Sequence, residues 1–221
     1  MKAFATFLFT LTLALAASAA SANLLSNPGF ESDIVYDAVP PDNWLGFSNP
    51  GVGVPVENFG VFSSTNNPRT GEQSLEVYIS DFSGTFVGAL QQVTGLTSGL
   101  AATFSGWIAG TSEGGSAAPG LEIRIEWIDF ASGQEIARTG NLTPTPGDTY
   151  EFFSLTDIVP AGADAATLVF VLESFTGPAN LQVAFLDDTE FSVAPIPIPA
   201  VAFLFPAGLI AGLGWMRRQA G

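Results

Sequence analysis

Within residues 120–130, GLEIRIEWIDF, positions 121–127 alternate strictly between apolar and polar side chains, and this pattern constrains the fold more than any other feature of the sequence. The apolar set is Leu121, Ile123, Ile125 and Trp127, and the polar set is Glu122, Arg124 and Glu126. A period of two places successive side chains on opposite faces of an extended chain, so the pattern predicts a strand with one buried and one exposed face. A helix would need apolar residues at every third or fourth position instead.

The same alternation recurs along the chain, in segments bounded by Gly, Pro, Asn, Asp and Ser. These segments are residues 52–59, 74–80, 87–93, 100–110, 149–158, 166–174 and 180–188. No helical period of useful length occurs between residues 23 and 194. Short strands separated by such turns predict an all-β fold, a two-sheet jelly-roll β-sandwich. Residues 33–72 are rich in Pro, Asn and Gly, so we expect loops there, across one rim of the sandwich.

The chain contains neither cysteine nor histidine. It therefore cannot build a Ser-His-Asp or Cys-His nucleophile, a histidine zinc site or a disulfide. A pair of carboxylates could still support glycoside hydrolysis, but the chain has 21 acidic residues and their spacing singles out no pair. We therefore expect a protein that is not an enzyme.

Residues 23–194 are strongly acidic. They contain all 21 acidic residues but only three basic ones, Arg69, Arg124 and Arg138, which gives a formal charge of −18. A field of this sign repels nucleic acid and anionic membrane surfaces. It suits cations or neutral glycans as partners, and we expect no nucleic-acid partner.

The N-terminus has the three parts of a secretory signal peptide. Lys2 supplies a positive charge, residues 3–16 are an apolar run, and Ala20 and Ala22 form an A-x-A cleavage site. We predict a signal peptide over residues 1–22, cleaved between Ala22 and Asn23. The alternative is an uncleaved N-terminal membrane anchor, for which the apolar run is short.

The C-terminus combines a proline motif, an apolar run and two arginines. Residues 199–216 are apolar or small over 18 positions, about 27 Å as a helix, which is just enough to cross a bilayer. Arg217 and Arg218 would stay in the cytoplasm under the positive-inside rule, with the acidic domain outside. We predict one transmembrane helix within residues 195–221 and a β-sandwich domain over residues 23–194.

The proline motif, IPIPA with Pro197 and Pro199, resembles the VPLPA variant of the PEP-CTERM sorting signals that exosortases read. The resemblance implies an inner-membrane intermediate, cleavage near the prolines by an exosortase-type enzyme, and delivery to the cell surface or extracellular matrix. Proteins with this signal typically come from Gram-negative bacteria that make exopolysaccharide, and many belong to the biofilm matrix. The alternative is a plain single-span, membrane-anchored periplasmic domain, which meets the same span and charge rules.

Four stretches of the acidic domain follow the order of a known layout. They are NLLSNPGFES, TGEQSLEVYIS, GALQQVTGLTSGLAATFSGWIAG and VAFLDDTEFSV. This order resembles the jelly-roll carbohydrate-binding modules with a galactose-binding-like fold, whose motifs include N-x-G-F-E and a late D-D-V-x-L. The resemblance implies a module that binds polysaccharide, such as exopolysaccharide. Because the fold also serves adhesion and structural modules, a structural or adhesive surface protein that binds other proteins is the alternative.

The last of these stretches contains two adjacent aspartates. The apolar residues Leu181, Val183 and Phe185 share one face of the predicted strand. If that face is the core face, Asp187 is carried into the core and Asp188 points away. A buried carboxylate is costly unless it is paired or binds a metal, and the domain has only three arginines.

The resemblance implies a structural Ca²⁺ ion bound by Glu31, by Asp187 and by backbone oxygens near Ser74. A set of ligands made only of oxygen atoms suits Ca²⁺. The alternative is that Glu31 and Asp187 only accept backbone hydrogen bonds at the ends of strands.

A sugar-binding site needs an exposed aromatic ring with polar groups beside it. Trp107 shares a predicted face with Thr103 and Ser105, which makes it the best candidate for a ligand-contacting ring. Arg124 and Glu126 lie on the polar face of residues 120–130 and could supply polar contacts. The alternatives are a packed aromatic side chain and a solvated charged face.

Overall fold

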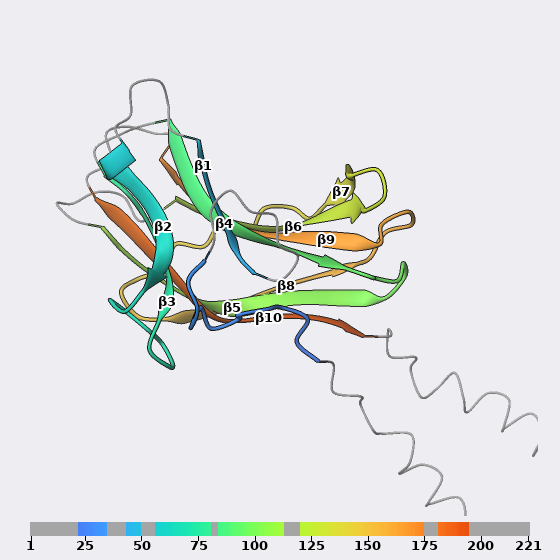
Figure 1. Ribbon diagram of the computed structural model, residues 1–221, viewed down its shortest axis with the longest axis horizontal. Coiled ribbons are helices and arrows are strands. Elements are labelled where there is room, and N and C mark those ends of the chain that lie inside the picture. Colours follow the sequence, from blue (N-terminus) through green and yellow to red (C-terminus); the bar gives the residue numbers. More distant parts are fainter. Residues whose placement is uncertain are drawn as a thin grey trace, which may run out of the picture.

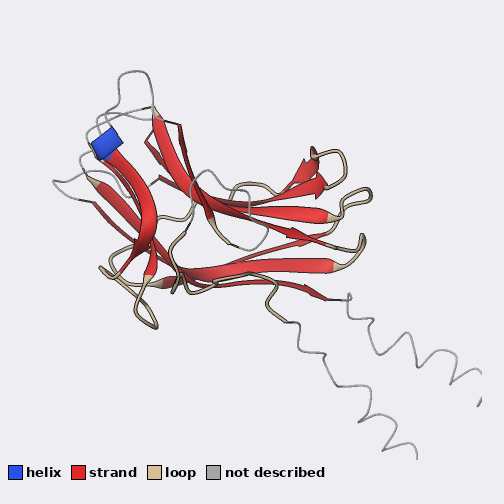
Figure 2. Cartoon of the chain, viewed as in Figure 1, coloured by secondary structure: helices blue, strands red, loops and turns tan. Residues whose placement is uncertain are grey.

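The computed structural model describes residues 22–34, 43–49, 56–80, 84–112, 120–174 and 181–194. These residues form ten strands and one short 3-10 helix, and the strands pack as two layers (Figure 1, Figure 2). The prediction of an all-β, two-sheet sandwich is therefore confirmed for the described part of the chain.

The first sheet has the strand order β1-β4-β9-β6-β7, and the second sheet has the order β2-β3-β10-β5-β8. The first sheet consists of β1 (Leu45–Asn49), β4 (Thr85–Thr94), β6 (Gly120–Asp129), β7 (Gln134–Arg138) and β9 (Ala165–Ser174). The second consists of β2 (Phe59–Ser64), β3 (Ser74–Ile79), β5 (Ala101–Ser112), β8 (Glu151–Ile158) and β10 (Gln182–Ala194). Neighbouring strands run antiparallel, and the chain crosses repeatedly between the sheets, as in a jelly roll.

Apolar side chains from the inner faces of both sheets form one core between the layers. Strand β6 contributes the alternating apolar set that the sequence predicted, and all four of these side chains are buried. Trp127 is fully buried, and its indole N–H donates to the Asp157 carboxylate of β8 over 2.9 Å. Trp44, just before β1, is fully buried and packs on Phe30 with ring centroids 5.2 Å apart. The core therefore includes side chains from loops as well as from strands.

Several predicted element boundaries are wrong. Strands β1 and β2 lie within residues 33–72, where loops were predicted, and part of the predicted strand over residues 52–59 forms the 3-10 helix η1 (Val56–Asn58). The sequence pattern also did not predict β7. These three strands stand at the edges of their sheets, and each has only five or six residues. Short edge strands bury few side chains, so little alternation is available to reveal them.

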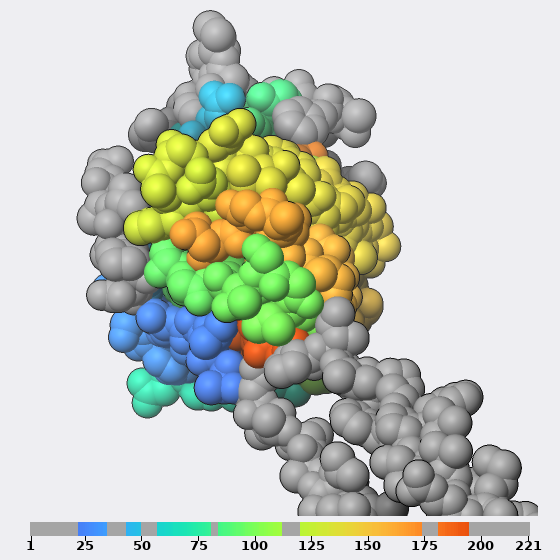
Figure 3. Space-filling view, turned by 90° about the vertical axis from the view of Figure 1, so that its right-hand side faces the viewer, coloured from blue at the N-terminus to red at the C-terminus, as the bar shows by residue number. Residues whose placement is uncertain are grey.

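The N-terminal segment 22–34 contains no strand. Asn27 and Phe30 have φ values of 47° and 56°, and this left-handed conformation interrupts an extended chain. The segment nevertheless lies against the end of β10, because the N–H of Leu24 donates to the carbonyl of Phe191 over 2.8 Å. Figure 3 shows this segment, in blue, beside the red end of β10. Glu31 therefore reaches the sandwich from a loop rather than from a strand end.

The face shared by residues 181, 183 and 185 is not the core face. Strand β10 turns the intervening side chains, such as Leu186, into the core. Val183 and Phe185 belong to a second, smaller apolar cluster, which lies on the outer face of the second sheet. The premise for burying Asp187 in the core is thus wrong, although Asp187 itself is fully buried. The pairing register shifts just after it, where Asp188 has a φ of 46°.

The predicted signal peptide, proline motif and C-terminal arginines lie outside the described residues, except that Ala22 and Asn23 are included. Within the described ranges, no helix is long and apolar enough to cross a membrane. The transmembrane helix within residues 195–221 stays a prediction.

Candidate functional site

The outer face of the second sheet carries a row of side chains that crosses three strands. Antiparallel pairing places Asp187 of β10 opposite Trp107 of β5, and Trp107 opposite Phe152 of β8. Directly paired residues of neighbouring strands point to the same face of a sheet. The rings of Trp107 and Phe152 meet edge to face with centroids 5.3 Å apart, and Phe152 is 57% exposed. We call Trp107 and Phe152 the aromatic pair.

Arg69 covers the ring of Trp107. Its guanidinium carbon lies 3.8 Å from the ring centroid, which is a cation–π contact. Its Nη1 lies 2.5 Å from Oδ2 of Asp188, and the hydroxyl of Thr70 donates to Oδ1 of the same carboxylate over 2.6 Å. The side chains of Arg69 and Asp188 are 30% and 28% exposed, so water partly screens this ion pair. One face of the Trp107 ring is therefore already occupied by a cation.

Asp187 holds the loop from which Arg69 projects, residues 65–73 between β2 and β3. Its Oδ2 accepts from the backbone N–H groups of Arg69 and Thr70 over 2.8 and 3.3 Å. Its Oδ1 accepts from the N–H of Asp188 over 2.7 Å. Burial raises the pKa of Asp187, and these N–H donors partly oppose the rise because they stabilise the charged form. The Asp187 carboxylate thus accepts backbone hydrogen bonds from the loop, as the carbonyl groups of a neighbouring strand would do in a sheet.

Glu31 holds the other end of the same loop. Its carboxylate accepts from the backbone N–H of Glu72 over 3.0 and 3.1 Å, and from that of Gln73 over 3.4 Å. Gly29 lies near both side chains, since a Cβ built on it would be 3.7 Å from Oδ1 of Asp187 and 3.9 Å from the Cγ methylene of Glu31. The structure therefore brings two of the three predicted metal ligands to one loop.

Ser74, the third predicted ligand position, is fully buried and donates its hydroxyl to the carbonyl of Asn67 over 3.1 Å. The groups that contact Glu31 and Asp187 are backbone N–H donors, as in the hydrogen-bonding alternative. A carboxylate has about four acceptor positions, so these contacts leave some lone pairs for another partner. No three Asp, Glu, His or Cys side chains of the described ranges are grouped as a metal site. A Ca²⁺ ion would depend on two carboxylates and backbone oxygens, and it stays a prediction.

A pocket of about 280 Å³ lies beside the aromatic pair, on the same face of the second sheet. Its lining residues are Asn67, Ala109, Gly110, Thr111, Asp148 and Phe185. Ala109 and Phe185 are 0% and 7% exposed and supply an apolar floor. Tyr150 supports the rim, because its hydroxyl donates to the carbonyl of Asn67 over 2.6 Å. Burial raises the pKa of Tyr150 to about 12, so this donor stays protonated at neutral pH.

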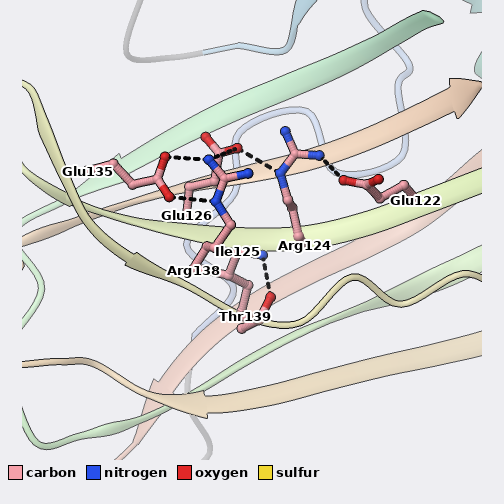
Figure 4. Close-up of polar contacts among 7 residues, drawn as sticks. All are labelled: Glu122, Arg124, Ile125, Glu126, Glu135, Arg138 and Thr139. Carbon is pink, nitrogen blue, oxygen red and sulfur yellow. Dashed lines mark hydrogen bonds and ion pairs between the residues drawn. The ribbon is translucent and has the colours of Figure 1, made fainter.

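Arg124 and Glu126 lie on the outer face of the first sheet, on the opposite side of the sandwich from Trp107. Arg124 forms an ion pair with Glu122, and its Nε lies 2.7 Å from Glu126. Figure 4 shows how Arg138 and Glu135 of β7 extend this network. The predicted ligand residues are therefore not brought together, since one sugar ring cannot contact both outer faces. The alternation of β6 indicates that Arg124 and Glu126 point outward but does not indicate which sheet contains the strand.

No protein-family model matches the sequence, and no curated protein matches it. The fold is similar to several solved structures. The CBM22-1 xylan-binding domain of Paenibacillus barcinonensis Xyn10C superposes with a TM-score of 0.51 and 18% identity, over 82% of this chain and 100% of that one. The Clostridium thermocellum Xyn10B CBM22-1-GH10 modules, complexed with xylohexaose, superpose with a TM-score of 0.51 and 15% identity, over 81% of this chain and 30% of that one.

The enzymatically active domain of bacteriophage CBA120 tailspike protein 4 gives a TM-score of 0.57 and 18% identity, over 78% of this chain. This chain spans only 21% of that protein. At such identities the likeness concerns the fold alone. It confirms a jelly-roll sandwich of the kind found in carbohydrate-binding modules.

Sequence reasoning missed Arg69, Phe152 and the pocket. Phe152 and Phe153 are adjacent in a predicted strand, so alternation indicates that one of them faces outward but not which one; the structure buries Phe153 and exposes Phe152. No local pattern could have found Arg69, because its ion pair joins residues 119 positions apart in the chain.

The outer face of the first sheet generates a prediction about pH. Burial and a hydrogen bond with Glu122 raise the pKa of Glu173 in β9 to about 7, from an ordinary value near 4.5. Between these values the folded protein binds more protons than the unfolded chain, so the free energy of unfolding should fall as pH rises through this window. We expect Glu173→Gln to flatten that fall, as measured by urea denaturation at pH 5 and pH 8.

Glu135→Gln is the matched control, because a hydrogen bond from Arg138 lowers the pKa of Glu135 below its ordinary value of 4.5. Glu135 is therefore ionised in both the folded and the unfolded state between pH 5 and pH 8, and its replacement should leave the fall in stability unchanged. If wild type and Glu173→Gln showed the same change in stability between pH 5 and pH 8, the raised pKa of Glu173 would be contradicted.

Proposed function

We propose that this protein binds polysaccharide on the outer face of the second sheet. The observation that carries the proposal is the aromatic pair, which stands beside an apolar-floored pocket on one open sheet face. Sugar rings pack their apolar faces on aromatic side chains and form hydrogen bonds with adjacent polar groups. Phe152 offers an exposed ring, while Asn67 and Asp148 offer polar groups at the pocket.

The spacing of these features suits a chain of sugars rather than a single one. Trp107 and Ala109 are two residues apart on β5, which corresponds to about 7 Å along the strand. One short oligosaccharide can therefore contact the aromatic pair and the pocket together. A xylan-binding domain and a module complexed with xylohexaose share the fold, which supports a glycan as ligand without naming it.

The outer face of the first sheet is the weaker candidate. Arg124 is already paired with two glutamates, and its side chain is only 17% exposed. A sugar would have to compete with these ion pairs for the same hydrogen-bonding groups. We therefore assign the glycan to the aromatic pair and leave Arg124 and Glu126 out of the site.

We further propose that the protein is exported and sorted by an exosortase-type enzyme to the cell surface or biofilm matrix. The proposal is supported by the order of the signal peptide, the IPIPA motif, the apolar run and the two terminal arginines. The motif contains prolines at 197 and 199, a residue type that disfavours helix and favours the extended backbone that a processing enzyme can bind. The acidic charge of residues 23–194 suits a protein that remains soluble outside the cell.

We keep a structural Ca²⁺ ion as a proposal for the loop 65–73. Its support is that Glu31 and Asp187 both bind this loop, and that the available ligands are all oxygen atoms. Binding to the folded protein alone raises stability, so metal-free protein should show a higher melting temperature when Ca²⁺ is added. The Glu31→Gln variant should lose this response, and calorimetric titration should show heat only for wild type. If wild type showed neither heat nor a shift in melting temperature, Glu31 and Asp187 would only accept backbone hydrogen bonds and the Ca²⁺ proposal would be wrong.

The glycan proposal is tested with a glycan array on the full-length chain. We expect Trp107→Ala and Phe152→Ala each to weaken binding about tenfold, or about 1.4 kcal/mol, because each removes a stacking surface. Phe130→Ala is the matched control: Phe130 is 56% exposed, like Phe152, but lies at the β6–β7 turn of the first sheet. Equal losses in Phe130→Ala, or no loss in the two site variants, would refute the site.

The sorting proposal is tested by intact mass and C-terminal sequencing of protein recovered from its native cells. We expect a chain that begins at Asn23, ends near Pro197–Ala200 and is absent from the membrane fraction. A chain that keeps Arg217 and Arg218 in the membrane would instead indicate a plain single-span anchor.

A further inference from the structure

The aromatic pair carries a cation that belongs to the protein itself. The guanidinium carbon of Arg69 lies over the Trp107 ring, 3.8 Å from its centroid, and the guanidinium forms an ion pair with Asp188 at 2.5 Å. An aromatic face and a carboxylate that converge on one positive group are the two elements of a cation site. The contacts of Arg69 thus show that this position stabilises a positively charged group.

The Arg69 side chain can leave without unfolding its loop. The loop is held by other atoms, namely the backbone N–H groups of Arg69 and Thr70 on Asp187 and the Thr70 hydroxyl on Asp188. The ion pair and the cation–π contact are partly exposed, and such contacts are individually weak. A polymer that carries many cationic groups presents them to this position repeatedly, so one of them can replace the Arg69 guanidinium.

The electrostatic surroundings favour a positive ligand. Asp148 lines the pocket, Asp188 and Asp187 lie beside the aromatic pair, and Glu190 is exposed further along β10. Arg69 is the one basic side chain that the described residues place on this face, and Asp188 already neutralises it. The site lies in a domain with a formal charge of −18. A polyuronate would be repelled by this field, and a neutral glycan would gain nothing from it.

We infer that the ligand is an amino-sugar polysaccharide with free, protonated amino groups, whose ammonium replaces the Arg69 guanidinium between Trp107 and Asp188. This inference rests on the proposed function, and it names the chemical class of glycan for the same site. The ammonium binds the Asp188 carboxylate, and the apolar face of the sugar packs on the aromatic pair. A neighbouring sugar of the polymer enters the pocket over Ala109 and Phe185.

The test compares two oligosaccharides with the same sugar backbone and linkage: the β-1,4-linked glucosamine hexamer, whose amino groups can be protonated, and its fully N-acetylated counterpart, whose acetamide groups are neutral. Calorimetric titration of the full-length chain should give at least about fivefold tighter binding of the charged hexamer, as expected for one partly exposed cation–π contact. Asp188→Asn should remove this preference, so that the two hexamers bind alike. Asparagine is tolerated at the φ of 46° that Asp188 adopts, so this variant should fold.

Two further variants separate the specific contact from bulk charge. Glu135→Gln removes one negative charge on the opposite outer face and should leave the preference intact. Arg69→Gln frees the ring and the carboxylate, and should strengthen binding of the charged hexamer severalfold. Weaker binding of both hexamers in Arg69→Gln would instead make Arg69 a direct sugar contact and overturn the inference.

The outcomes for the site and for its ligand class are distinct. Equal binding of the two hexamers, with no effect of Asp188→Asn, would overturn the inference and leave the glycan proposal standing. Failure of the charged hexamer, the acetylated hexamer and every glycan of the array to bind would overturn both.

Discussion

The buried carboxylate of Asp187 organises the outer face of the second sheet. It lies where β10 loses its regular register, and it accepts three backbone N–H groups, two of them from a loop more than a hundred residues earlier in the chain. Without such donors a buried carboxylate would be too costly to keep. The loop in turn places Arg69 over Trp107 and Thr70 on Asp188. The positions of Arg69 and Thr70 at the candidate site thus depend on this one carboxylate.

The two outer faces of the sandwich use their charges differently. On the first sheet, two arginines form ion pairs with three glutamates along β6 and β7, so each arginine there is already paired. On the second sheet, the described part of the chain places one arginine, Arg69, among several carboxylates, next to aromatic rings and a pocket. Charged side chains that are already in ion pairs interact only weakly with a ligand, whereas a surface with an excess of one charge attracts ligands of the opposite charge. This contrast is why the second sheet is the better binding face.

Strands buried on one face could be predicted from sequence because their alternation follows directly from the period of an extended chain. Strand β6 is the clearest example, and its four apolar side chains are all buried in the core. Strands β1, β2 and β7 lie at sheet edges, where short strands with few buried side chains show little alternation. The face of β10 was assigned wrongly because both of its faces carry apolar side chains, one in the core and one in the outer cluster.

The sequence by itself determined the all-β class, the outward direction of Trp107, Arg124 and Glu126, and the acidic charge that limits the ligand. These properties are local or additive, so they can be read from spacing and composition. Only the tertiary structure decided that Arg124 lies on the opposite face from Trp107, and that Arg69 covers the Trp107 ring. Alternation specifies a face relative to its own strand, but the pairing of strands distant in the chain decides which side chains share a surface.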